Sequence, residues 1–76
     1  MYPRRAMERE PIGSSVIAAV GYDSDEEVLE IEFRSGRVYQ YFDVPRRVHK
    51  ALLAADSLGA YFNTRIKPRY RSAEVR

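Results

Sequence analysis

The sequence predicts an α+β domain, in which a three-stranded antiparallel β-meander is followed by two short helices packed on one face, in the order β-β-β-α-α. Two patterns carry this prediction. Apolar residues alternate with charged or polar ones on both sides of Ser35 and Gly36, as in a β-hairpin. After Pro45 the apolar residues recur at helical spacing instead. A chain of 76 residues holds one core, so a second domain is not expected.

Residues 15–22 are the first expected strand, because this run is uncharged and rich in β-branched aliphatic residues. Residues 28–34 and 37–42 are the second and third, joined at a glycine that accepts a positive φ angle. If Phe33 pairs with Val38, the core face carries Leu29, Ile31, Phe33, Val38, Gln40 and Phe42. The opposite face then carries Glu30, Glu32, Arg34, Arg37, Tyr39 and Tyr41.

Residues 45–55 are expected to form the first helix, since proline suits a helix start. Its buried stripe consists of Val44, Val48, Ala51, Leu52 and Ala55, which leaves Arg46, Arg47 and Lys50 in solvent. A second short helix is expected over residues 58–66, because Ser57 is a suitable N-cap and Pro68 ends the pattern.

These elements define a domain over residues 14–67. The residues before it, 1–13, carry two prolines and alternating charges, and are expected to form an irregular lead. The residues after it, 68–76, have no apolar periodicity and are expected to form a basic mobile tail.

The net charge of +2 conceals a strong asymmetry along the chain. Residues 1–32 carry 3 basic and 8 acidic side chains, whereas residues 33–76 carry 10 basic and 3 acidic ones. A molecule polarised in this way can present a basic patch to nucleic acid although its net charge is small.

Catalytic, metal-binding and cofactor-binding residues are not expected. The chain has no cysteine and a single histidine, His49, so neither a metal cluster nor a nucleophile with its base can be assembled in the usual ways. The absence of cysteine fits a reducing compartment, and no apolar run is long enough to span a membrane. The sequence therefore predicts a non-enzymatic protein of the cytoplasm.

Tyr39 and Tyr41 are the most distinctive candidate site residues. On the expected register they lie on the sheet face away from the helices, where aromatic side chains can stack on the bases of RNA or single-stranded nucleic acid. Phosphates would be contacted by Arg34 and Arg37 beside them, and by Arg46, Arg47 and Lys50 on the first helix. The alternative is that the two tyrosines form ordinary cross-strand pairs or pack beneath residues 1–13.

A second function class is suggested by the first strand. Residues 15–22 form an edge of the expected meander and yet hold no charge, which is a feature that proteins usually cover. This strand predicts either a homodimer or protein partner that pairs along it, or a cover supplied by residues 1–13.

Six short motifs, in their order and spacing, resemble the KTSC family, a short domain named for its place at the C-terminus of some lysyl-tRNA synthetases. They are Ser14-Ser15-x-Ile17, Gly21-Tyr22-Asp23, Leu29-x-Ile31-x-Phe33-x-Ser35-Gly36, Tyr39-x-Tyr41, Val44-Pro45 and Ser57-x-Gly59-x-Tyr61-Phe62-Asn63-x-x-Ile66. The resemblance covers about residues 13–67. It implies a small domain with no known catalytic activity, which in many bacterial members stands alone, and its synthetase context suggests RNA binding.

Overall fold

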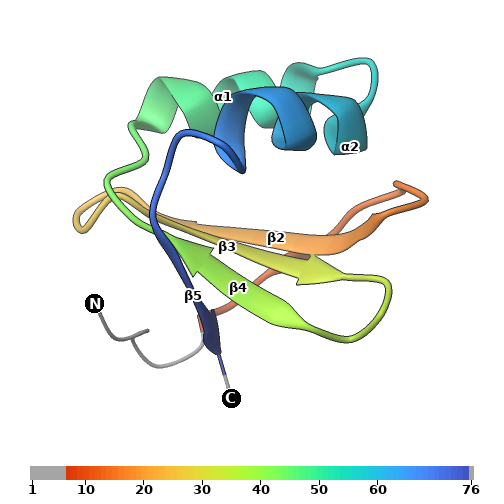
Figure 1. Cartoon of the computed structure of the whole chain (residues 1–76), viewed down its shortest axis with the longest axis horizontal. Helices are drawn as coiled ribbons and strands as arrows, with labels where there is room; N and C mark the ends of the chain where they lie inside the picture. The colour runs from red at the N-terminus through yellow and green to blue at the C-terminus, as the bar shows by residue number, and fades with distance from the viewer. Residues whose placement is uncertain (1–6, 76) are drawn as a thin grey trace.

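A five-stranded antiparallel sheet with helices on one face makes up the computed structural model, which describes residues 7–75 (Figure 1). The strands are β1 (Glu10–Pro11), β2 (Ile17–Asp23), β3 (Val28–Phe33), β4 (Val38–Tyr41) and β5 (Ser72–Val75), and they lie side by side in chain order. The helical layer consists of α1 (Arg46–Ala54), α2 (Leu58–Tyr61) and the π-helical turn η1 (Phe62–Ile66). The predicted α+β class is confirmed, with more strands than expected.

Strands β1 and β5 form the two edges of the sheet, and neither was predicted as a strand. A cover supplied by residues 1–13 was, however, one of the alternatives expected for the edge at residues 15–22, and β1 lies along that edge. Glu10 and Pro11 pair with Val20 and Ala19 of β2, so part of the expected irregular lead is a strand. At the other edge, β5 pairs along the whole of β4, so the region expected as an irregular tail also contains a strand. Both are short edge strands held by backbone hydrogen bonds to a neighbour, which leave little trace in the pattern of side chains. Residues 1–6 and 76 of the two expected segments lie outside the described residues.

The hairpin between β3 and β4 is shifted by one residue from the expected register. Phe33 donates its N–H to the carbonyl of Arg37 over 2.9 Å, and Gly36, with a φ of +94°, donates to the carbonyl of Phe33 over 2.9 Å. The turn thus has three residues and not two, a common arrangement with glycine in the left-handed position. As a result Tyr41 lies opposite Leu29, and Tyr39 lies opposite Ile31.

This shift exchanges the two faces of β4, because neighbouring residues of a strand point to opposite sides of the sheet. Tyr39 and Tyr41 face the helices, whereas Val38 and Gln40 face away from them together with Glu30. The predicted assignment of β4 residues to the two faces is therefore wrong, although the predicted strand itself is confirmed.

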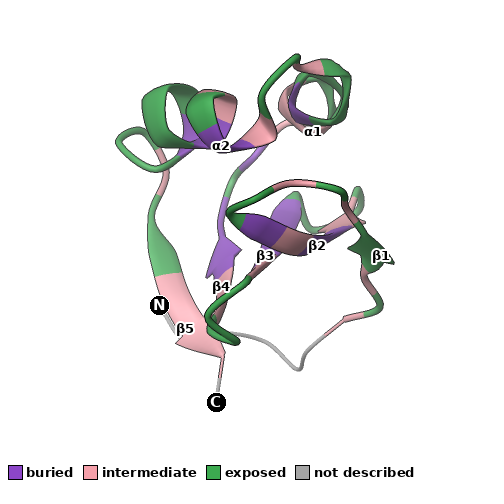
Figure 2. Ribbon diagram, turned by 90° about the vertical axis from the view of Figure 1, so that its right-hand side faces the viewer, coloured by how far each residue is buried: buried purple, intermediate pink, exposed green. Residues whose placement is uncertain are grey.

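The core fills the space between the sheet and the helices (Figure 2). A bulge in β2 between Ile17 and Ala19 turns both Ile17 and Val20 toward the helices. The phenyl ring of Phe62 anchors the second helical segment, with its centroid 5.4 Å from that of Phe33 and 5.3 Å from that of Tyr41. The buried cluster consists of Ile17, Val20, Leu29, Ile31, Tyr41, Val44, Leu52, Phe62 and Ile66.

The helical layer follows local sequence signals closely. Helix α1 begins directly after Pro45. Of the residues predicted for the buried stripe, Val44 and Leu52 are buried and Val48 and Ala55 are half-buried. The prediction is wrong for Ala51, which is exposed because it lies about 100° around the helix from Leu52. The Ser57 hydroxyl accepts a hydrogen bond from the backbone N–H of Ala60 over 3.2 Å, which confirms the predicted N-cap. In the part of the chain that the structure describes, no helix has the length and apolar character to cross a membrane.

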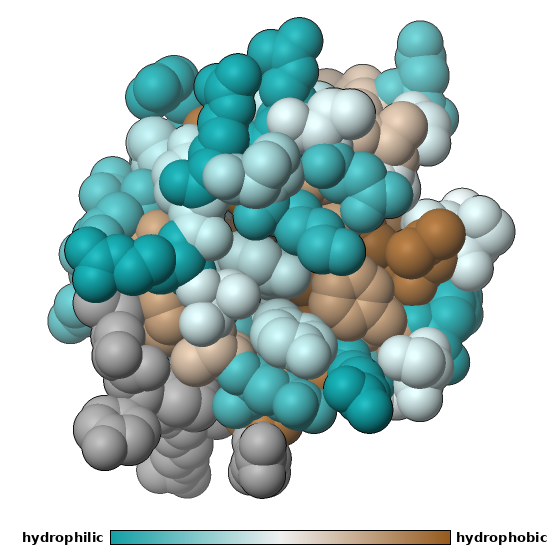
Figure 3. All heavy atoms as spheres, viewed as in Figure 1, coloured by the Kyte–Doolittle hydropathy of each residue, from teal (hydrophilic) through white to brown (hydrophobic). Residues whose placement is uncertain are grey.

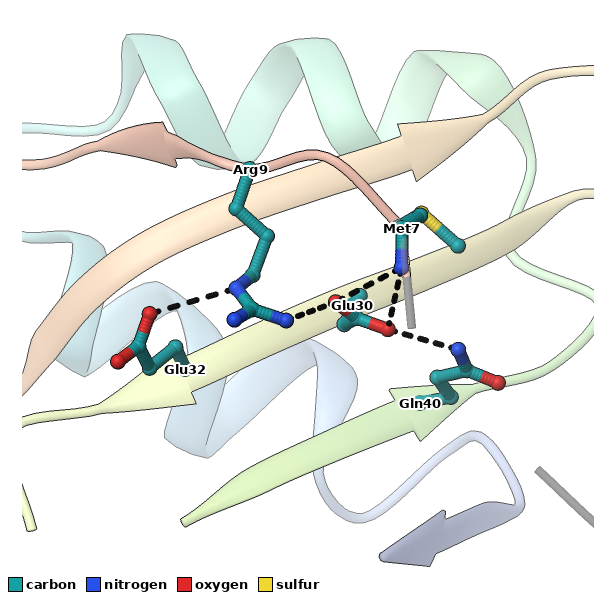
Figure 4. Close-up of polar contacts among 5 residues, drawn as sticks. All are labelled: Met7, Arg9, Glu30, Glu32 and Gln40. Carbon is teal, nitrogen blue, oxygen red and sulfur yellow. Dashed lines mark hydrogen bonds and ion pairs between the residues drawn. The ribbon is translucent and has the colours of Figure 1, made fainter. Parts of the chain in front are cut away.

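Residues 7–11 are here called the strap. Its β1 part lies beside β2 at the edge of the sheet, and residues 7–9 cross the sheet face that points away from the helices (Figure 4). Two small residues of β2, Ala19 and Gly21, lie on that face, since they pair with Glu32 and Glu30. A Cβ atom at Gly21 would lie 2.5 Å from the carbonyl oxygen of Glu8. The strap lies this close to the sheet only because position 21 carries no side chain.

The strap is held by Glu30, whose side chain is fully buried beneath it. The guanidinium of Arg9 forms an ion pair with Glu30, and its Nε atom lies 3.3 Å from an Oε1 atom of Glu32. The Glu30 carboxylate also accepts hydrogen bonds from the Met7 backbone N–H, at 3.3 and 3.4 Å, and from the Gln40 amide at 2.7 Å (Figure 4). A charge at this depth is tolerated because each of these groups donates to it.

Candidate nucleic-acid interface

Tyr39 and Tyr41 lie in or against the core and not on an open face. The side chain of Tyr41 is only 4% exposed, and its ring packs edge-on against Phe62. Burial, with a smaller contribution from Tyr39, raises the pKa of the Tyr41 hydroxyl to about 12. Tyr39 is half-buried, with its ring centroid 6.0 Å from that of Phe33. The predicted platform for stacking bases is therefore not formed by these two residues.

Arg34 and Arg37, the predicted neighbours of the tyrosines, have different roles. Arg34 donates from Nε to the carbonyl of Ser14 over 2.9 Å and from Nη2 to the carbonyl of Ile12 over 2.8 Å. It therefore ties the segment before β2 to the β3–β4 turn, and its donors are largely used within the molecule. Arg37 is exposed in the same turn.

Arg46, Arg47 and Lys50 are all exposed on α1, as predicted. Their orientation is set by Leu52, which is fully buried on the opposite side of the helix. The sequence located these three basic residues correctly because an amphipathic helix fixes both its inner and its outer side at once.

Four further basic residues join them in the structure. Arg65 lies on η1, and Lys67, Arg69 and Arg71 lie on the segment that connects η1 to β5. All four are exposed. Arg69 and Arg71 lie in the segment expected to be a basic mobile tail, whereas Arg65 and Lys67 lie within the predicted domain. The close spacing of basic residues from Arg65 to Arg71 is the sequence signal that marks all four.

These seven exposed residues are here called the basic layer: Arg46, Arg47, Lys50, Arg65, Lys67, Arg69 and Arg71. Only one acidic residue, Asp56, occurs between Pro45 and Arg71. Within residues 7–75, none of the seven forms an ion pair with a carboxylate, in contrast to Arg9. Hydrophilic side chains gather over the helices in the view of Figure 3. The basic layer is thus a surface suited to an anionic partner.

A groove of about 460 Å³ lies between the strap and α1. His49 stands in its wall, half-buried and stacked on Tyr22 with 4.6 Å between ring centroids and 14° between ring planes. Burial lowers the pKa of His49, against the opposing effect of the Glu10 carboxylate. The Tyr22 hydroxyl donates to the carbonyl of Val44 over 2.6 Å. Among the described residues, no three His, Cys, Asp or Glu side chains are grouped so that they could hold a metal ion.

Comparison with known proteins identifies the family. The KTSC domain model matches residues 13–70 of the chain. An uncharacterised protein of Stutzerimonas stutzeri is 47% identical over 64 residues, which cover 84% of this chain and 90% of that protein. The crystal structure of a KTSC domain protein from Yersinia pestis superimposes with a TM-score of 0.89 at 41% identity, and the match covers 93% of this chain and all of that one.

The same segment also occurs within a much longer protein. A lysine–tRNA ligase of Nostoc punctiforme is 44% identical over 61 residues, which cover 80% of this chain and only 11% of the ligase. The match between sequence model, relatives and solved structure leads to one conclusion: this chain belongs to the KTSC domain family.

Proposed function

We propose that this domain is a non-catalytic module that binds RNA through contacts between the basic layer and backbone phosphates. The observation that carries the proposal is that seven exposed basic side chains follow one another along α1, η1 and the segment that leads to β5, with a single acid between Pro45 and Arg71, and that none of them pairs with a carboxylate among residues 7–75. Lys and Arg side chains placed in this way displace the counterions that surround RNA, and this release favours binding.

Apart from Arg37, which is exposed at the β3–β4 turn, the basic residues of the described chain divide into two groups by what they contact. Arg9 and Arg34 bind Glu30 and backbone carbonyls within the molecule, so their charges serve the fold. The side chains of the basic layer make no comparable contact with residues 7–75, so toward this part of the chain their donors are not used. A surface whose charges are not needed for folding is a better candidate for ligand binding than the charge count alone would suggest.

The relatives give independent support. A segment similar to most of this chain is part of a lysine–tRNA ligase, whose name gives a transfer RNA as what it acts on. By contrast, the structure gives less reason to expect a protein partner that pairs with residues 15–22. Part of that edge is already occupied, because β1 pairs with β2 at Ala19 and Val20. We therefore favour RNA over a partner that adds a strand there.

The test is fluorescence anisotropy with labelled RNA across a series of salt concentrations. Replacing Arg46 and Arg47 together by alanine should reduce the slope of log affinity against log salt by about one to two. The control variant is Arg37→Ala, which removes an exposed arginine from the β3–β4 turn, below the helical layer in Figure 1, and should leave the slope nearly unchanged. Binding no tighter than about millimolar at low salt would overturn the proposal. An equal effect of Arg37→Ala would overturn the assignment to the basic layer.

A further inference from the structure

We infer, resting on the proposed function, that the RNA recognised by the basic layer is base-paired, and that it is bound by the shape of its backbone instead of by stacked single-stranded bases. Two features of the structure lead to this class of ligand. Both faces of the sheet are covered, and four of the seven basic side chains, Arg46, Arg47, Lys50 and Arg65, are carried by helical segments that are anchored in the core.

The first feature concerns aromatic side chains. Proteins that bind single-stranded RNA stack its bases on exposed aromatic rings, often on an open sheet face. None of the eight aromatic residues among residues 7–75 is exposed; three are buried and five are half-buried. Those that the sequence favours for stacking, Tyr39 and Tyr41, pack against Phe33 and Phe62 instead. The eight are Tyr22, Phe33, Tyr39, Tyr41, Phe42, Tyr61, Phe62 and Tyr70.

The sheet itself offers no alternative platform. One face is covered by α1, α2 and η1, and the other is crossed by the strap (Figures 1 and 2). Under the strap, Glu30 and Gln40 are fully buried, and the guanidinium of Arg9, which pairs with Glu30, also pairs with the carboxylate of Glu32. A negatively charged strand of RNA would be repelled from this face even if the strap moved.

The second feature is the rigidity of the helical part of the basic layer, which carries Arg46, Arg47, Lys50 and Arg65. Its helices are anchored by Leu52 and Ile66, which are fully buried, and by Phe62, which is 2% exposed. The backbone positions of the charges on α1 and η1 are therefore fixed relative to one another. A fixed array of charges favours a partner whose phosphates are also fixed, because a flexible strand must lose conformational entropy on binding. A-form RNA presents such phosphates and is recognised largely by shape.

The experiment is a competition between two RNAs of the same length and base composition, one a hairpin with a stem of about 16 base pairs and the other unpaired. Each competes with a labelled hairpin for the full chain at fixed salt. We expect the hairpin to compete at a concentration about tenfold lower than the unpaired RNA. Tyr39→Leu, shown by circular dichroism to be folded, should leave both affinities unchanged, whereas Arg46→Ala with Arg47→Ala should weaken hairpin binding.

Each outcome separates this inference from the function on which it rests. Equal or tighter binding of the unpaired RNA, or its selective loss in Tyr39→Leu, would overturn the inference while leaving RNA binding in place. Failure of both RNAs to bind would overturn the proposed function itself. A hairpin preference that persists in the Arg46→Ala and Arg47→Ala variant would place the duplex on another surface and would also overturn the inference.

Discussion

Gly21 shows how a single residue determines what can cover a sheet. Its position in β2 lies under the strap, and even one added carbon would collide with the carbonyl oxygen of Glu8 at 2.5 Å. Because the contact is with backbone, it cannot be relieved by turning a side chain. The same position opens the Gly21-Tyr22-Asp23 motif, one of those in which the sequence resembles the KTSC family, and the contact with Glu8 is a physical reason for glycine there.

Gly21→Ala is expected to lower the free energy of unfolding by about 1–3 kcal/mol, since the strap must move to admit the methyl group. The matched control is Gly13→Ala, where a Cβ atom meets nothing within 4 Å. Urea denaturation should show little change for the control, or a small gain from reduced freedom of the unfolded chain. Equal losses in both variants would contradict the account of the strap contact.

Tyr41 provides a second prediction at this scale, concerning pH. Its pKa is raised from 10.0 to about 12, mainly by burial, so the folded state keeps the proton longer than the unfolded state does. The unfolded state therefore binds fewer protons between these values, and stability should fall as pH rises from about 10 to about 12. Absorbance titration should detect a late-ionising tyrosine that Tyr41→Phe removes. A variant that loses stability over the same interval as steeply as the parent would contradict this role.

Among the elements, the edge strand β1 is held by more than its two residues of pairing. The strap that contains it is fastened by Arg9, which reaches the buried carboxylate of Glu30, and by the backbone N–H of Met7. An edge strand of this length would fray readily if only its own hydrogen bonds held it. The ion pair between Arg9 and Glu30 attaches the strap to the sheet. In return, the Glu30 carboxylate is buried and needs the charge of Arg9 to offset the loss of its hydration.

Arg9→Ala should therefore destabilise the domain by about 1–3 kcal/mol, because Glu30 loses a charged donor while staying buried. Arg37→Ala removes an exposed arginine and should change stability by no more than about 0.5 kcal/mol. Amide exchange gives a local readout, since Ile12 donates its N–H to the carbonyl of Ala18 just beyond β1. Faster exchange at Ile12 in Arg9→Ala is expected, and unchanged exchange there would show that the ion pair does not hold the strap.

Over the whole molecule, sequence patterns predict what is periodic and miss what is not. The three central strands and both helices were predictable because each must bury one side, which imposes a period of 2 or of about 3.6 residues. Strands β1 and β5 bury little and are held by neighbours, so they leave no such period. Both also lie outside residues 13–70, the part that matches the family model.

The candidate site divides in the same way. Arg46, Arg47 and Lys50 were placed correctly, since the inner stripe of α1 fixes its outer side. Tyr39 and Tyr41 were placed on the wrong face, because alternation alone cannot distinguish a two-residue turn from a three-residue one. Where Arg69 and Arg71 lie relative to the helices could not be predicted from the sequence. Their position depends on the segment that returns from η1 to β5, and this path is a feature of the tertiary structure.

The three-residue turn between Phe33 and Arg37 separates two kinds of change that evolution could make there. An added residue can be taken up as a longer loop while the pairing of β3 with β4 stays as it is, so Gln40 and Tyr41 keep their faces. A slip of the pairing by one residue would instead bring Gln40 into the core and expel Tyr41, without any change in chain length. The turn should therefore tolerate variation in length far better than variation in register.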